Sequence, residues 1–174
     1  LLVQIGNCDS LPQLLSEGRS LFLQQLGVRE TIFLLADSHK GVLCGSPVPG
    51  QSSLVTDLQV PIDPAFSLVA RCLIEGGVHD SLTIEKGQVS VVDRSLLRLT
   101  ASPRFACLPL TTSDQFGVVV VGLDEKHDIE EFATSKSQEL CRAIGRSLQN
   151  YVQSAMLLGR RSGDRIELRR VAHE

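Results

Sequence analysis

The sequence lacks the features that define several large classes of protein. No apolar run approaches the ~20 residues that a membrane-spanning helix needs, and there is no internal repeat or low-complexity segment. Residues 1–10 show no signal-peptide pattern. We therefore expect no membrane association and a cytoplasmic location.

Motifs for common catalytic and ligand chemistry are also missing. The five cysteines form no C-x-x-C pair, and no Cys/His set has zinc-ligand spacing, so we predict no metal site. Neither a G-x-x-x-x-G-K motif nor a strand-coupled G-x-G-x-x-G motif is present. An odd number of scattered cysteines fits free thiols in a reducing compartment. We predict no cofactor, and any ligand is an unidentified small molecule.

What is present describes an ordinary folded domain. The 174 residues are 43% hydrophobic and 21% charged, enough for one domain with a buried core plus an appended helix. The net charge is −3, and basic residues gather only among the arginines of residues 160–170. A nucleic-acid surface needs clustered basic residues on the folded body. We therefore predict no nucleic-acid partner and interpret those arginines as one solvated face of a helix.

Periodicity and end signals predict alternating helices and strands. Ser10 and Pro12 are typical of a helix start, and the apolar spacing that follows predicts a helix ending at Gly27. Asp63 and Pro64 predict a second helix start. Residues 90–100 predict a third, short helix, with Ser90 and Asp93 as its capping pair. The strands are expected at residues 31–36, 42–44, 105–111 and 116–123, and a long helix from 127. The last two strands are apolar on both faces, which predicts a central place in the sheet.

This order of elements resembles a GAF domain, with a PAS domain as the nearest competitor. The resemblance rests on Leu14-Leu-Ser-Glu-Gly18, on the Asp63-Pro64 helix start and on Phe116-Gly-Val-Val-Val-Val-Gly-Leu123. It implies an α/β (α+β) fold, in which helices flank a mostly antiparallel sheet of five or six strands with a ligand pocket on one face. The expected boundaries are a linker at 1–9, the GAF-like domain at 10–151, and a signalling helix at 152–174.

The specialised sites of that family are absent from this chain. There is no Asn-Lys…Phe…Asp-Glu pattern of cyclic-nucleotide binders and no Cys-His dipeptide of bilin binders. Cys44, Cys72 and Cys107 are flanked by apolar residues, an unsuitable setting for thiolate catalysis. From the resemblance we predict a pocket between the sheet and residues 66–99. Its expected lining residues are Phe66, His79, Ser81, Leu96 and Cys107.

The C-terminal segment carries a second resemblance. Ile166-Glu-Leu-Arg-Arg-Val-Ala-His173-Glu174 resembles the start of a histidine-kinase dimerisation helix, which implies that His173 accepts a phosphoryl group beside Glu174. The apolar residues upstream step by four and three, as in a coiled coil, and predict a parallel homodimer. The residues of this dimer seam are Ile144, Leu148, Tyr151, Ala155 and Leu158. The implied partner is a kinase ATP-binding domain that follows in the same chain.

The sequence therefore predicts a regulatory module with no enzymatic activity of its own. The absence of an initiator Met and the end at Glu174 lead us to expect a piece of a longer signal-transduction protein. In the leading hypothesis it is a GAF-like sensor coupled to a histidine-kinase output. The alternatives are a ligand-free dimerisation scaffold and, third, a cysteine-dependent redox enzyme.

Overall fold

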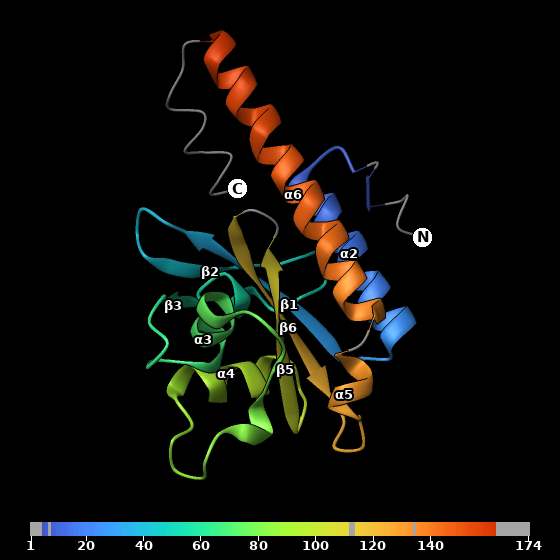
Figure 1. Ribbon diagram of the computed structural model, residues 1–174, viewed down its shortest axis with the longest axis vertical. Coiled ribbons are helices and arrows are strands. Elements are labelled where there is room, and N and C mark those ends of the chain that lie inside the picture. Colours follow the sequence, from blue (N-terminus) through green and yellow to red (C-terminus); the bar gives the residue numbers. More distant parts are fainter. Residues whose placement is uncertain (1–4, 7, 112–113, 134, 163–174) are drawn as a thin grey trace.

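The computed structural model describes residues 5–6, 8–111, 114–133 and 135–162. In this part of the chain the strands form one six-stranded sheet in the order β3-β2-β1-β6-β5-β4, and every pairing is antiparallel (Figure 1). The strands are β1 (Glu30–Asp37), β2 (Val42–Ser46), β3 (Gln59–Pro61), β4 (His79–Asp80), β5 (Arg104–Thr111) and β6 (Gln115–Leu123). The predicted sheet of five or six mostly antiparallel strands is confirmed.

The two apolar strands lie inside the sheet, as their composition predicted. β6 pairs with β1 on one side and β5 on the other, and β5 also pairs with the two-residue β4. All four valines of residues 118–121 are fully buried. Because neighbouring strand residues point to opposite faces, these valines supply both faces of the sheet.

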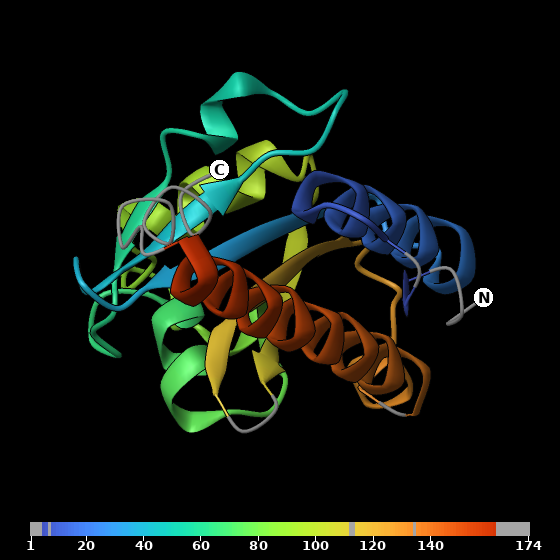
Figure 2. The ribbon, with the colours of Figure 1, turned by 90° about the horizontal axis from the view of Figure 1, so that it is seen from above.

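Each face of the sheet has its own core and its own helices (Figure 2). Phe33, Val119 and Val121 belong to the cluster that α2 (Leu11–Leu26) and α6 (Ser135–Ser162) cover. Ile32, Val118 and Val120 belong to the cluster under α3 (Leu68–Glu75) and α4 (Val91–Leu99). The protein is thus a three-layer arrangement, with long helices on one face and short helices on the other.

Two of the three helix starts that were expected from capping residues are confirmed. Ser10 caps α2 by accepting a hydrogen bond from the Gln13 amide, and the left-handed Gly27 ends the helix. Ser90 caps α4 in the same way, accepting from the Asp93 amide at 3.0 Å. Side-chain oxygens at these positions satisfy amides that have no partner within the helix.

The expected helix start at Asp63-Pro64 is wrong. Asp63 forms a turn instead, in which its Oδ1 accepts from the Ala65 amide at 2.9 Å and its carbonyl from the Phe66 amide. The helix begins four residues later, where the Ser67 hydroxyl accepts from the Ala70 amide. Asp and Ser both favour turns and caps, so the sequence alone did not distinguish the two positions.

The exit helix α6 follows a short helix, α5 (Ile129–Phe132), and extends past the edge of the sheet (Figure 1). It is continuous across residue 151, where the sequence suggested a domain boundary. Ile5, which we assigned to a linker, is 1% exposed and belongs to the core under α2 and α6. Ile5 therefore packs as part of the domain.

Candidate functional site

A pocket of about 430 Å³ opens on the α3/α4 side of the molecule. Its walls come from the segment before α3, the first turn of α3, the segment that joins β4 to α4, and the first turn of α4. A volume of this size falls in the range of small-molecule sites, about 300–1,000 Å³. The lining residues are Ala65, Phe66, Ser67, Leu68, Arg71, Thr83, Ile84, Glu85, Gln88, Ser90 and Asp93. We call it the α3–α4 pocket.

One buried carboxylate joins the two helices of this pocket. Asp93 is 3% exposed, and its Oδ1 accepts from the Leu68 amide at 3.2 Å, at the start of α3. Its Oδ2 accepts from the Ser90 hydroxyl at 2.7 Å, at the start of α4. A negative charge is favourable at a helix N-terminus because the backbone dipoles and free amides point there. Asp93 thus fixes the relative position of two walls of the pocket.

The third wall is held by Asp80 at the end of β4. Its Oδ1 accepts from the Leu82 amide at 3.1 Å and so caps the 3₁₀ turn η2 (Ser81–Thr83). Its carbonyl accepts from the Thr83 hydroxyl at 2.7 Å, and Thr83 faces the pocket. A short turn without a core of its own depends on such bonds for its position.

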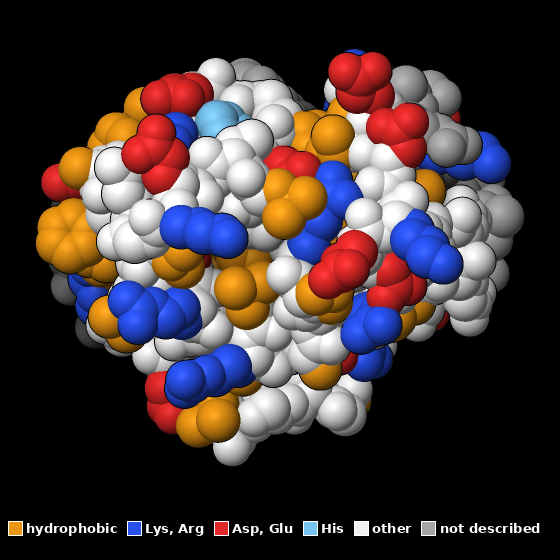
Figure 3. Space-filling view, turned by 90° about the horizontal axis from the view of Figure 1, so that it is seen from below, with side chains coloured by type: hydrophobic (Ala, Val, Ile, Leu, Met, Phe, Trp, Pro, Cys, Tyr) orange, Lys and Arg blue, Asp and Glu red, His pale blue; other side chains and the backbone are white. Residues whose placement is uncertain are grey.

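The polar side chains at the mouth of the pocket are of both charges. Arg71 in α3 and Glu85 in the segment between β4 and α4 are exposed, and Phe66 is 57% exposed. An aromatic side chain beside one positive and one negative group suits a small polar ligand with a flat or cationic part. On the neighbouring face below α4 and α5, acidic, basic and apolar side chains are interspersed (Figure 3).

The structure brings few of the predicted pocket residues to this site. Phe66 is the one that lines it. Leu96 and Cys107 are fully buried in the core beneath α3 and α4, where apolar side chains fill the space between helices and sheet. His79 bonds the Gly76 carbonyl at 2.9 Å, and the Ser81 hydroxyl accepts from the Phe105 amide at 3.0 Å.

The pocket therefore lies at the rim of this layer rather than deep against the sheet. Sequence analysis missed Arg71, Glu85 and Gln88, since isolated polar residues in helices and loops carry no spacing signal. It did identify Ser90 and Asp93 as a capping pair. Their second role, which joins α4 to α3 through the Leu68 amide, depends on tertiary contacts.

Three of the five cysteines are buried where thiolates do not form readily. Burial raises the pKa of Cys72 to about 12 and that of Cys107 well above its usual value. Burial likewise raises the pKa of Cys141. The thiolate is the nucleophile in cysteine chemistry, so these three side chains are unreactive core residues near neutral pH.

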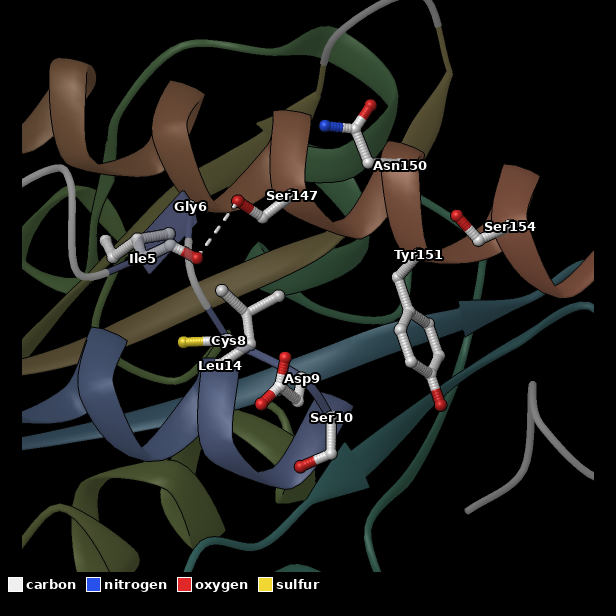
Figure 4. A pocket seen from close by; sticks show the side chains of 10 residues that line it. All are labelled: Ile5, Gly6, Cys8, Asp9, Ser10, Leu14, Ser147, Asn150, Tyr151 and Ser154. Atoms are coloured by element: carbon white, nitrogen blue, oxygen red, sulfur yellow. Dashed lines mark hydrogen bonds between the residues drawn. The ribbon is translucent and has the colours of Figure 1, made fainter.

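A second pocket, of about 400 Å³, lies on the opposite side of the sheet (Figure 4). It is bounded by the N-terminal segment, the start of α2 and the middle of α6, and the Ser147 hydroxyl donates to the Ile5 carbonyl across it at 3.5 Å. Asp9 is its charged lining residue, together with half-buried Cys8 and Tyr151.

The first two residues of the predicted dimer seam belong to the core of a single chain. Ile144 is fully buried and Leu148 is 4% exposed, in the cluster that α6 shares with α2 and the sheet. Because α2 and the sheet of the same chain cover these two residues, neither is exposed for contact with a second copy. Tyr151 is half-buried. The side chains of Ala155 and Leu158, and the whole of His173 and Glu174, lie outside the described residues.

The described part of the chain holds neither a cluster of metal ligands nor a helix suited to cross a membrane. Among those residues, no group of three or more His, Cys, Asp or Glu side chains is arranged to hold a metal ion. No helix within the same residues has both the length and the apolarity that a membrane span requires.

Comparison with known proteins identifies the architecture. No family model and no curated protein matches the sequence. Among solved structures, the GAF domain of an Acinetobacter phosphoenolpyruvate-protein phosphotransferase superposes with a TM-score of 0.68 at 17% identity, over 91% of this chain and 92% of that one. The fold is GAF-like. This result favours the GAF resemblance over the PAS alternative.

Other solved structures share the GAF-like fold. A segment of a methyl-accepting chemotaxis protein, residues 122 to 287, gives a TM-score of 0.65 at 13% identity and covers 86% of this chain and 94% of that one. Free methionine-R-sulfoxide reductase from Neisseria meningitidis, in complex with its substrate, gives 0.63 at 14% identity, over 88% and 86%. At these identities the likeness concerns the fold.

Proposed function

We propose that this GAF-like domain is a regulatory sensor that binds a small polar molecule in the α3–α4 pocket. The observation that carries the proposal is the construction of this pocket. Its walls are two capped helices and a 3₁₀ turn, held together by Asp93 and Asp80, and its mouth presents a ring and charges of both signs. Preformed pockets with a few convergent polar groups are typical of ligand sites.

The GAF-like neighbours support a regulatory role in this chain. One is part of a chemotaxis protein and another belongs to a phosphotransferase. We propose that the domain works in the cytoplasm and forms a homodimer through the part of α6 beyond Leu148, where Val152 is 36% exposed. A signalling helix continuing from α6 then leads to His173 and Glu174, and a kinase ATP-binding domain of the same protein phosphorylates His173.

Thermal melting with a panel of nucleotides and metabolites tests ligand binding. A ligand that binds only the folded state raises the melting temperature by mass action. At least one compound is expected to stabilise the wild type, and Ala65→Trp, which adds bulk at the mouth of the pocket, is expected to abolish the shift. The control is Gln59→Trp, at an exposed position in β3 that lies outside the pocket lining. No shift with any compound would contradict the proposal.

The kinase coupling has a separate test in the full-length protein. His173→Gln is expected to abolish acid-labile phosphorylation from ATP while folding and dimerisation stay intact. Phosphorylation that persists in this variant would reject His173 as the acceptor, and it would leave ligand sensing by the domain unaffected.

A ligand-free dimerisation scaffold is the second candidate, and one observation favours it. The space between the sheet and the short helices is filled by apolar side chains, with Leu96, Phe105 and Cys107 fully buried. A scaffold predicts a dimer in solution and no response to any compound. The redox-enzyme alternative loses support because burial raises the pKa of Cys72 and of Cys107.

A further inference from the structure

A buried ion pair lies directly behind the wall of the α3–α4 pocket. Arg104 is 4% exposed and Asp80 is 9% exposed. Arg104 Nε donates to Asp80 Oδ1 at 3.0 Å, and Arg104 Nη2 donates to Asp80 Oδ2 at 2.7 Å. Two parallel bonds fix both the distance and the plane of the two groups. The geometry is therefore rigid, and a movement of one side chain is passed to the other.

On one side, this pair controls the pocket wall. The Oδ1 atom that bonds Arg104 also accepts from the Leu82 amide, and the Asp80 carbonyl accepts from the Thr83 hydroxyl. Thr83 lines the pocket, together with Ile84 and Glu85, which follow it in the chain. A ligand that pulls this segment inward therefore displaces the η2 turn that Asp80 caps.

On the other side, the same guanidinium holds the route to the exit helix. Arg104 Nη1 donates to the His127 carbonyl at 2.8 Å and lies 3.5 Å from the Glu125 carbonyl, both in the loop between β6 and α5. Asp128 Oδ1, at the end of this loop, accepts from the Glu130 amide in α5 at 2.9 Å. The Ser137 hydroxyl in the first turn of α6 then donates to the Phe132 carbonyl at the end of α5.

We propose that the Asp80–Arg104 pair couples the α3–α4 pocket to the β6–α5 loop and so to the start of α6. This inference rests on the proposed function, since it names the regulation of that same site. A buried ion pair adds little to stability because of the cost of desolvation, so stability alone gives a weak reason for this one. Arginine suits the role because its planar fork bonds the carboxylate and the loop carbonyls at once, whereas the single ammonium of lysine lacks that fork.

Hydrogen exchange of the ligand-free protein tests the coupling directly. Thr83→Val removes the bond to the Asp80 carbonyl at an exposed position, so the variant is expected to fold. Amides of residues 81–88 should exchange faster, by roughly fivefold for one lost hydrogen bond. The coupling predicts that amides of residues 124–132 also exchange at least about twofold faster, which is the lower end of the effect of substitutions along a coupling path.

Two further variants make the result decisive. Ser52→Ala likewise removes one side-chain hydrogen bond, here from the distant 3₁₀ turn η1 (Ser53–Val55), and should leave residues 124–132 unchanged. Arg104→Lys should raise exchange at 124–132 by itself and abolish the further effect of Thr83→Val there. The coupling is overturned if Thr83→Val speeds exchange only at 81–88, or if its effect on 124–132 persists with lysine at position 104.

The comparison of Thr83→Val with Ser52→Ala shows whether the pocket wall and the β6–α5 loop are coupled even if Arg104→Lys does not fold. Because no ligand is added, this experiment and the thermal-melting panel fail independently. A silent panel with coupled exchange contradicts the sensor, whereas a responsive panel with uncoupled exchange contradicts the Asp80–Arg104 link.

Discussion

Substitution of Leu148 distinguishes the structural role of α6 from the dimer seam that its sequence suggests. Leu148 is 4% exposed and packs with Ile144 in the core shared with α2 and the sheet. Leu148→Ala deletes buried methyl groups and leaves a cavity, which costs about 2–5 kcal/mol. For a domain of this length, each kcal/mol lowers the melting temperature by about 2–4 °C, so we expect a decrease of roughly 10 °C.

Leu148→Asp adds the cost of a buried charge without a partner, which is several kcal/mol more. Since domain stability is typically about 5–15 kcal/mol, we expect this variant to be largely unfolded. Circular dichroism melting and light scattering measure folding and oligomeric state together. The matched control is Gln153→Asp, on an exposed position of the same helix. The reasoning is refuted if Leu148→Asp melts like the wild type and merely dissociates a dimer.

Three further predictions follow from particular contacts. Gly117→Ala should lower stability by about 1–3 kcal/mol in denaturant unfolding, because a Cβ there would lie 2.2 Å from the Leu34 backbone oxygen; Gly6→Ala, with nothing within 4 Å, should be neutral. Iodoacetamide added to the native protein near neutral pH should alkylate Cys8 and Cys44, which are partly exposed. It should not alkylate Cys72 or Cys107, because burial raises the pKa of Cys72 to about 12 and that of Cys107 well above its usual value. Labelling of Cys72 before unfolding would contradict its burial. Burial alone would raise the pKa of Glu30, but its bonds with Arg19, the Thr31 amide and Gln51 outweigh burial and lower it. The Glu30 carboxylate therefore stabilises the fold at pH values above its unfolded pKa of about 4.3. This contribution is lost as the pH falls through the lower pKa of the folded state. Thermal melting at several pH values should show that Glu30→Gln loses less stability on acidification than the wild type.

Predictions from the sequence were correct where a residue type has one dominant structural role. The apolar strands 105–111 and 116–123 and the caps at Ser10 and Ser90 follow from composition and local hydrogen bonding, and the structure contains all of them. The prediction of a helix start at Asp63 failed because an Asp side chain can cap a helix or form a turn. Which of the two it does depends on where α3 meets α4 in the fold.

The pocket lining and the dimer seam were harder to predict from the sequence, because both depend on contacts between distant parts of the chain. Leu96 and Cys107 are apolar residues on the expected face, but periodicity does not reveal whether other side chains fill the space above them. The step of four and three residues through Ile144 and Leu148 indicates a buried stripe. It does not say whether that stripe packs on its own chain or on another, and here its first two residues pack on their own chain.

Chemical-shift mapping by NMR tests the central claim most directly, with the compound that gives the largest thermal shift. The account predicts that the amide signals of residues 65–71 and 83–93, around Phe66, Arg71 and Asp93, shift in proportion to the fraction of protein bound. Perturbations centred instead on residues 5–14 and 147–154 would place the ligand in the pocket beside α6 and contradict the proposed site.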